Sequence, residues 1–336
     1  MVSLHILDQP VIGPAFCHPR TPLRAHCIGS TTPAIDPQQY SAAIHDLYQH
    51  YEQHVMRPEE ETEADGRRSD LVPLVINTYG WSKGLGADLF QSIYDITRPA
   101  VILRLGHATV SVSEAEEVAG PRIHQLDSIS DALSTSKITA ADARVLMLLS
   151  YMYSNASSST WSFDKPLVSQ TPLTLDWTSS ALQSIHIIPE EVAYEHALYA
   201  LNGSLVAVLV STTEEELEPR LPGFPYDPQY PLPSPAETTC LGYALIRSID
   251  PSTTSLHILT PIPIQQLNKP VMLVKAEIEL PVVAMLDQQQ ILSGREADSV
   301  CGVEWEGVPY LTLDIGEGAG AAKRRARRNL QRKSLA

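Results

Sequence analysis

Apolar and polar positions follow two different patterns along the chain, and the change falls near position 185. In the first part, short apolar runs at 72–78 and 100–105 have the character of buried strands. Amphipathic stretches at 36–54 and 85–97 have the character of helices. Strands that alternate with helices are typical of a parallel sheet with helices on its faces. The first part of the chain is therefore predicted to be an α/β region.

Local signals support the boundaries of these elements. Asp36 is a good N-cap and Pro37 a good first helical residue. Pro99 is expected to stop the helix at 85–97, because proline cannot continue a helix. A strand at 23–28 and a helix at 139–152 complete the predicted elements of this part.

Short β-rich runs separated by turn signals fill the second part of the chain. Asn202-Gly203 is a candidate hairpin turn between two of these runs. The pattern predicts a small all-β domain over 185–315, either a barrel or a sandwich. Residues 156–184 are predicted to be a linker, and 316–336 a basic tail.

Charge is distributed unevenly along the chain. The formal net charge of the 336 residues is -15, which argues against a surface that is basic throughout. Nucleic acid, if bound, must therefore meet a local cleft or the tail. That tail either contacts RNA and directs nuclear import, or is simply solvated. Seven cations crowd its last fourteen residues: Lys323, Arg324, Arg325, Arg327, Arg328, Arg332 and Lys333.

The cysteines and the apolar runs limit the possible classes of protein. None of the four cysteines forms a CxxC pair, which argues against a zinc site, and no metal ligands are predicted in the chain. Reduced thiols in an intracellular protein are the expected state. No run of about 18 apolar residues occurs, so we expect no membrane span.

The turn after the run at 72–78 carries the most informative chemistry. Thr78 offers a hydroxyl, Gly80 a flexible backbone, Trp81 a flat aromatic face and Lys83 a cation. Ligands of α/β proteins bind where a strand ends and a helix begins, and this set of groups suits a nucleotide base and its phosphate. Other interpretations stay open: Trp81 as a core aromatic, and Lys83 as a solvated lysine.

Glycines and small residues in two turns are interpreted more simply. Gly80, Gly84 and Gly86 are expected to shape the turn rather than to bind phosphate. The turn at 29–33 is interpreted as a connection from strand to helix, in preference to a wall of a ligand cleft. The sequence contains no GxxxxGK[ST] motif and no Gly-Lys pair.

Four segments together resemble a known family. PLVINTYGWSKGLGADLF resembles the polynucleotide 5′-hydroxyl kinase family, in particular its nucleolar branch in ribosomal RNA processing. The resemblance extends from Val2 to about Leu313. Three more segments match in order and spacing: LRAHCIGSTTP, DARVLMLLSYMY and CLGYALIRSIDPSTTSLHILTP.

The resemblance implies an enzyme that transfers the ATP γ-phosphate, with Mg²⁺, to RNA 5′-hydroxyl ends. The family's TxGW clasp, which holds the RNA end, is matched by Thr78, Gly80 and Trp81, and Lys83 follows directly. Arg144 matches a lid arginine that acts in catalysis, although the family's set of several lid arginines is not reproduced. An endoribonuclease partner and a location in the nucleus and nucleolus are also implied.

The implied fold is α/β, with a partial P-loop kinase domain followed by a small β-rich C-terminal domain. Residues 1–155 would be the second half of the kinase domain, carrying clasp and lid, and 185–315 the C-terminal domain. The Walker A and Walker B elements of the family would precede this sequence. Because they cradle the phosphates and position Mg²⁺, the chain alone is expected to have no useful kinase activity. The alternative is a non-catalytic RNA-binding or scaffold protein of a ribosomal RNA processing complex.

Overall fold

The computed structural model contains two compact units, which we describe separately. The first unit combines Met1–Trp161 with Pro172–Glu279, and the second combines Ser162–Thr171 with Leu280–Ala336. The basic tail at 316–336 lies outside the described residues. Those residues are 1–8, 10–18, 20–56, 72–81, 83–106, 120–127, 140–155, 160–188, 192–212, 223–280, 282–285, 299–300 and 303–304.

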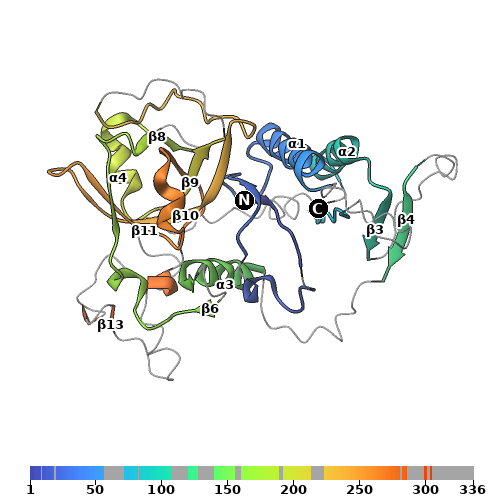
Figure 1. The fold of residues 1–336 in the computed structure, drawn as a ribbon, viewed down its shortest axis with the longest axis horizontal. Helices are drawn as coiled ribbons and strands as arrows, with labels where there is room; N and C mark the ends of the chain where they lie inside the picture. Colours follow the sequence, from blue (N-terminus) through green and yellow to red (C-terminus); the bar gives the residue numbers. More distant parts are fainter. Residues whose placement is uncertain are drawn as a thin grey trace, which may run out of the picture. The chain divides into compact units, whose positions relative to one another are not determined.

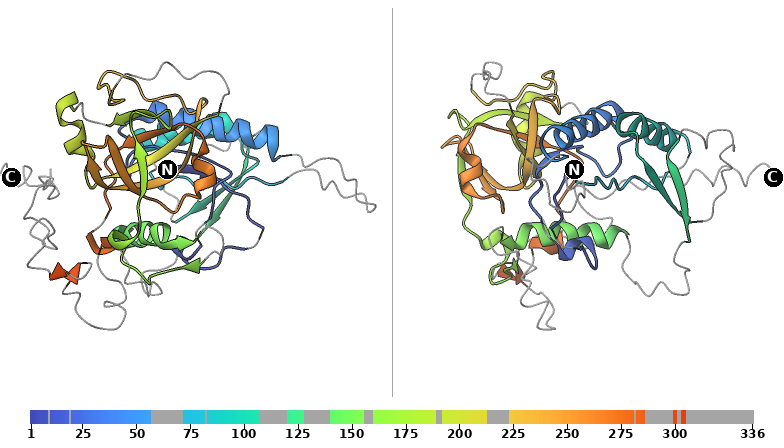
Figure 2. Two further views of the ribbon diagram at one scale, coloured as in Figure 1. Left: turned by 60° about the vertical axis from the view of Figure 1, so that its left-hand side comes forward. Right: turned by 45° about the vertical axis from the view of Figure 1, so that its right-hand side comes forward.

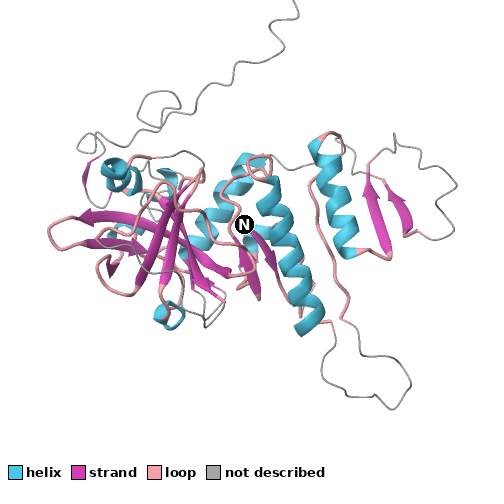
Figure 3. Cartoon of the chain, turned by 90° about the horizontal axis from the view of Figure 1, so that it is seen from above, coloured by secondary structure: helices cyan, strands magenta, loops and turns pink. Residues whose placement is uncertain are grey.

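The first unit contains a six-stranded sheet, on the left in Figures 1 and 3. Its strand order is β7-β11-β10-β9-β12-β8, and neighbouring strands are antiparallel except β12 and β8, which are parallel. The β-rich second half predicted from the sequence is therefore present. The strands are β7 (Leu173–Asp176), β8 (Leu182–Ile187), β9 (Leu205–Ser211), β10 (Thr238–Asp250), β11 (Ser255–Leu259) and β12 (Val271–Lys275).

Strand β9 is buried on both of its faces, which explains its unbroken apolar sequence. Val206 and Val208 pack into a core cluster on one face of the sheet. Ala207 and Leu209 belong to a second cluster on the other face. That second cluster includes Ala25 from β2 (Arg24–His26), so the beginning of the chain covers the sheet. A hydroxyl contact supports the docking, since the Thr239 Oγ1 donates a hydrogen bond to the Ala25 carbonyl oxygen at 3.3 Å.

The elements of the α/β part mostly match the prediction. β1 (Val2–Leu4) pairs with β2 in antiparallel fashion, and β3 (Val101–Leu105) pairs with β4 (Arg122–Leu126) in parallel. The chain is thus a mixed α/β protein with a parallel pair and helices, as predicted. Helices α1 and α2 lie side by side in both views of Figure 2. The helices of the unit are α1 (Pro37–His54), α2 (Leu85–Thr97), α3 (Ala140–Tyr153) and α4 (Ala197–Leu201).

The predicted helix boundaries of α1 and α2 are confirmed. The Asp36 side chain accepts a hydrogen bond from the Gln39 backbone N–H at 2.8 Å, and Pro37 begins α1. Helix α2 ends at Thr97, and Arg98 adopts a left-handed conformation directly before Pro99. Both boundaries depend on neighbouring residues only, which is why the sequence predicted them.

Two predicted elements are wrong. Residues 72–78 form no strand, since no described strand pairs with them and Val75 is 89% exposed. Asn202 and Gly203 do not form a β-hairpin turn; they connect α4 to β9, and Gly203 has a φ of 71°. A glycine with positive φ ends a helix as readily as it turns a hairpin, so the sequence signal was ambiguous.

Part of the segment 156–184, predicted to be a linker, contributes β7 and the start of β8 to the sheet. Short elements complete the structure. In the first unit they are β5 (Ser154–Asn155), β6 (Thr160–Trp161), η1 (Ala15–Cys17), η4 (Tyr194–His196) and η5 (Ile264–Asn268); in the second they are η3 (Leu167–Ser169), η6 (Val282–Met285), β13 (Ser299–Val300) and β14 (Val303–Glu304).

A buried ionic cluster joins α1 to β2. The Arg24 guanidinium donates to both Asp46 carboxylate oxygens, from Nε at 2.5 Å and from Nη2 at 2.8 Å. The His26 Nε2 donates to the same carboxylate at 2.7 Å. Burial by itself raises the pKa of Asp46, but hydrogen bonds from His26 and Arg24 outweigh burial and leave that pKa lowered. The ionised carboxylate therefore stabilises the fold.

We expect Asp46→Ala to lower the free energy of unfolding by about 3–5 kcal/mol at pH 7, because a buried guanidinium loses its partner. Since the pKa of Asp46 is lowered in the folded state, its contribution is present above the unfolded pKa of about 3.9 and is lost as pH falls further. Urea melts at pH 7 and pH 3 measure both effects. Exposed Asp127 supplies the control Asp127→Asn, and an equal loss in both variants would contradict the role of the cluster.

Candidate functional site

The predicted clasp residues lie together on one exposed turn before α2. Thr78, Gly80 and Lys83 are all exposed, and the Trp81 side chain is 44% exposed. The interpretation of Trp81 as a core aromatic therefore does not hold. The hydroxyl, the indole and the cation are available to a ligand from solvent.

Two glycines at the start of α2 shape the turn that carries Trp81. Gly84 precedes the helix with a φ of 57°, a conformation that side chains other than glycine rarely adopt. At Gly86, an added Cβ would overlap the Cβ of Trp81 and approach its carbonyl oxygen to 2.9 Å. Only glycine at position 86 allows this close approach. The two glycines thus have structural roles, in agreement with their interpretation as turn-forming residues.

A row of three aromatic rings runs from the core to the turn. Tyr40 on α1 is buried, at 4% exposure. Its ring meets Tyr79 edge-on, with centroids 5.8 Å apart and planes at 62°. Tyr79 is 42% exposed and lies beside Trp81, with centroids 5.7 Å apart and planes at 38°. Sequence reasoning passed over Tyr79, although residues two apart on an extended segment point to the same side.

Burial affects the ionisation of the two tyrosines. Desolvation raises the pKa of Tyr40 to about 12, with a smaller contribution from Tyr79. Desolvation also raises the pKa of Tyr79. Both rings therefore stay neutral at physiological pH. Neutral rings beside an exposed indole form an apolar stacking surface, and stacking of one base on an aromatic ring is worth about 1–3 kcal/mol.

Arg144, the predicted lid residue, is exposed on α3. The described residues supply no ion-pair partner for its guanidinium, nor do they join it to the turn through a hydrogen bond. The other end of α3 is fixed to the sheet, because the Tyr151 hydroxyl accepts a hydrogen bond from the Tyr243 N–H at 2.7 Å. It also donates to the Tyr243 carbonyl oxygen at 3.0 Å. The Arg144 side chain is thus exposed, and none of the described contacts brings it to the clasp.

The turn at 29–33 is mostly taken up by structural contacts. Gly29 and Ser30 are buried. The Ser30 hydroxyl donates to the Glu277 carboxylate at 2.8 Å, and the Glu277 N–H donates to the Gly29 carbonyl oxygen at 3.0 Å. The turn therefore fastens the strand-to-helix connection to the end of β12. This supports its interpretation as a connection.

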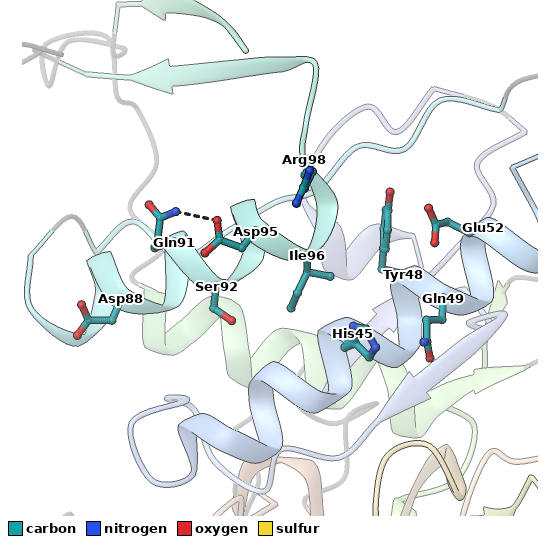
Figure 4. Close-up of a pocket in the computed structure, with 10 residues that line it drawn as sticks. All are labelled: His45, Tyr48, Gln49, Glu52, Asp88, Gln91, Ser92, Asp95, Ile96 and Arg98. Atoms are coloured by element: carbon teal, nitrogen blue, oxygen red, sulfur yellow. Dashed lines mark hydrogen bonds between the residues drawn. The ribbon is translucent and has the colours of Figure 1, made fainter. Parts of the chain in front are cut away.

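A separate open groove of about 880 Å³ lies between α1 and α2 (Figure 4). In its wall, the Gln91 amide donates to the Asp95 carboxylate at 2.9 Å, the dashed line of Figure 4. Three carboxylates outnumber the single guanidinium, so the groove would repel a polyanion. It shares no residue with the clasp turn. Its lining residues are His45, Tyr48, Gln49, Glu52, Asp88, Gln91, Ser92, Asp95, Ile96 and Arg98.

The described residues were compared with two kinds of feature, metal-binding clusters and membrane-spanning helices. Groups of three or more histidine, cysteine, aspartate or glutamate side chains in metal-binding arrangement do not occur there. In the same part of the chain, none of the helices combines the length and apolar character that crossing a membrane requires. The described cysteines, Cys17, Cys27 and Cys240, are free thiols.

Comparison with known proteins gives a consistent result. The family model described as the mRNA cleavage and polyadenylation factor CLP1 P-loop matches residues 1–154. Polynucleotide 5′-hydroxyl-kinase GRC3 of Cryptococcus neoformans (strain B-3501A) is 29% identical, over 100% of this chain and 50% of the relative. Polynucleotide 5′-hydroxyl-kinase grc3 of Schizosaccharomyces pombe is 27% identical, over 99% of this chain and 48% of the relative.

A more distant relative carries the same name as these two. Polynucleotide 5′-hydroxyl-kinase NOL9 of Arabidopsis thaliana is 24% identical, over 83% of this chain and 73% of the relative. A solved Clp1p–Pcf11p complex contains a chain with a TM-score of 0.44 and 15% identity, over 76% of this chain and 55% of that one. The chain spans about half the length of the two fungal kinases that it matches. Over nearly its whole length the chain is therefore similar to proteins named polynucleotide 5′-hydroxyl-kinase, and residues 1–154 match the CLP1 P-loop family model.

Proposed function

We propose that this chain binds RNA 5′-hydroxyl ends within a kinase that transfers the γ-phosphate of ATP to that hydroxyl. The observation that carries the proposal is the exposed Trp81, which lies against Gly86 on a turn that also presents Thr78 and Lys83. An exposed indole next to a cation suits a nucleotide, because the ring stacks on a base while the ammonium attracts phosphate.

Each group of the clasp has a separate role in this proposal. Trp81 stacks on a base near the RNA end, and Lys83 attracts the backbone phosphate that follows it. The Thr78 hydroxyl is the group that would hydrogen-bond to the terminal ribose. Gly80 leaves room for close approach of the RNA, since no described atom lies within 4 Å of an added Cβ at this position.

Arg144 is proposed as the lid cation. Phosphoryl transfer places negative charge on the equatorial oxygens of the moving group, and cations aimed at these oxygens lower the barrier. Arg144 is exposed on α3, so its guanidinium would reach such a group only when the lid helix and the RNA end come together.

The binding site for ATP, the phosphate donor, is not assigned to residues of this chain. P-loop kinases as a class use ATP with Mg²⁺, which is held by the P-loop hydroxyl and an acidic residue. The sequence has no Gly-Lys pair, and the described residues offer no acidic cluster for a metal. The residues that the structure describes therefore do not fit a magnesium site. The proposal therefore concerns how the acceptor RNA is held.

The wider biological setting belongs to the proposal as well. We place the protein in ribosomal RNA processing in the nucleolus, where an endoribonuclease would produce the 5′-hydroxyl ends. The seven cations within residues 323–336 support contact with RNA and nuclear import. The proposed functional regions are 1–155 for clasp and lid, 185–315 for the β-rich domain and 316–336 for the basic tail, with 156–184 between the first two. The first two regions contribute residues to one core cluster.

Trp81→Ala is expected to weaken binding of a 5′-hydroxyl RNA oligonucleotide by about 5- to 150-fold, the equivalent of losing 1–3 kcal/mol of stacking. Fluorescence anisotropy with a 3′-labelled oligonucleotide measures the affinity. Tyr199→Ala is the matched control, because Tyr199 is an aromatic residue with 85% exposure. Equal affinity of the Trp81→Ala and unsubstituted proteins would refute the clasp role of Trp81.

Gly80→Ala separates folding from ligand approach. Because the described structure has open space around the position, the variant should keep its melting temperature. Its RNA affinity should nevertheless fall at least severalfold, since the new methyl group enters space that the RNA would occupy. Thermal melts and the same anisotropy assay give the two readouts. A Gly80→Ala protein with normal stability and normal affinity would show that RNA does not approach here.

Arg144→Ala tests the lid role in a form of the protein that includes a P-loop segment. We expect the rate of labelled phosphate transfer from ATP to RNA to fall about 100-fold, with little change in the KM for RNA. Arg144→Lys should retain more of the rate because it keeps the charge. Transfer at the full rate by Arg144→Ala would exclude a catalytic role for Arg144. If the unsubstituted protein binds RNA but never labels it, the alternative function, a non-catalytic RNA-binding protein, takes the place of the kinase.

A further inference from the structure

Tyr79 is the aromatic residue next to the clasp indole that the proposed function leaves without a task. It is 42% exposed, close to the 44% of Trp81, so packing leaves a large part of its surface open to a ligand. Both residues lie on the extended segment before α2, two positions apart, and their ring centroids are 5.7 Å apart. Two exposed rings thus stand side by side at the place where RNA is proposed to bind.

The Tyr79 ring is held in position from the core. Buried Tyr40 meets it edge-on at 5.8 Å, and Tyr40 is itself packed in the cluster between α1 and α2. Residues from the start of α2, including Leu89 and Phe90, line a small cavity beside the same two tyrosines. A ring that is already ordered loses little conformational entropy when a base stacks on it. This preorganisation favours Tyr79 as a binding surface rather than a mobile side chain.

The spacing of the two rings suits bases that are separated from each other. Successive bases in a stacked strand are about 3.4 Å apart along the helix axis, less than the 5.7 Å between the centroids of Tyr79 and Trp81. Single-stranded RNA can separate its bases and place them on aromatic side chains, whereas a paired duplex end cannot. The arrangement therefore fits an unpaired end.

We propose that Tyr79 is a second base-stacking residue, so that the turn binds two neighbouring bases of a single-stranded RNA end, one on Trp81 and one on Tyr79. This inference rests on the proposed function and specifies its substrate. The end must be unpaired for at least two nucleotides. Because the chain as a whole is acidic, most of the affinity at the turn would come from stacking, with a small contribution from phosphate attraction.

Abasic RNA gives a sharp test. Three short single-stranded 5′-hydroxyl RNAs are used: one intact, one abasic at the first position and one abasic at the second. Tyr79→Leu should weaken binding of the intact RNA about fivefold or more. The loss should vanish with the RNA that lacks the base on Tyr79, and persist with the RNA that lacks the base on Trp81. Trp81→Ala should show the reverse dependence. Tyr79→Phe should bind normally, since the phenyl ring still stacks.

The controls separate this inference from simpler explanations. Thermal melts of Tyr79→Leu and Tyr79→Phe monitor folding, and Tyr199→Leu provides a matched exposed site. An equal loss with all three RNAs would mean that Tyr79 only supports Trp81, and no loss at all would mean that it has no role; either result overturns the inference. If Trp81→Ala also binds all three RNAs normally, the proposed function itself fails. A loss for Trp81→Ala without a loss for Tyr79→Leu overturns only the second stacking position.

Discussion

The Cβ and carbonyl group of Trp81 pack so closely against the first turn of α2 that only glycine fits at position 86. This contact fixes the position of Trp81 beside the helix. The tryptophan is 44% exposed, and its ring lies beside Tyr79. Gly84, in its left-handed conformation, lets the chain turn into the helix at this point. The proposed RNA site depends on these two backbone positions as much as on the indole.

A second constraint joins the two halves of the sequence. Strand β9 is apolar on both sides, and its second face is covered by residues from β2. The covering strand leads into the turn at 29–33, which is hydrogen-bonded to Glu277 beyond β12. The N-terminal α/β elements and the β-rich sheet therefore share a core within one compact unit. Asp46 on α1 binds Arg24 and His26 on that same strand. This cluster positions α1 and, with it, Tyr40 behind the clasp.

These constraints lead to a particular kind of nucleic-acid binding. A protein with a formal net charge of -15 gains little from general attraction to phosphate, in contrast to proteins with a basic face. The acidic groove between α1 and α2 strengthens this tendency on one side of α2. A pair of preorganised aromatic rings gains its binding energy from stacking, which every base supports through its π-face. Recognition of an unpaired end, with little dependence on sequence, follows from such chemistry.

The sequence by itself determined the features that depend on neighbouring residues. The cap of α1 at Asp36, the end of α2 before Pro99, the β-rich second half and the set of groups on the clasp turn all come from local patterns. Only the tertiary structure decided what depends on distant partners. Residues 72–78 have a strand's composition but lack a described pairing strand, and Tyr79 becomes a candidate through its contact with Tyr40 on another element. Likewise, the Asn202-Gly203 pair follows the end of a helix here. The conformation of such a pair suits either a helix end or a hairpin turn, and the surrounding fold selects one of them.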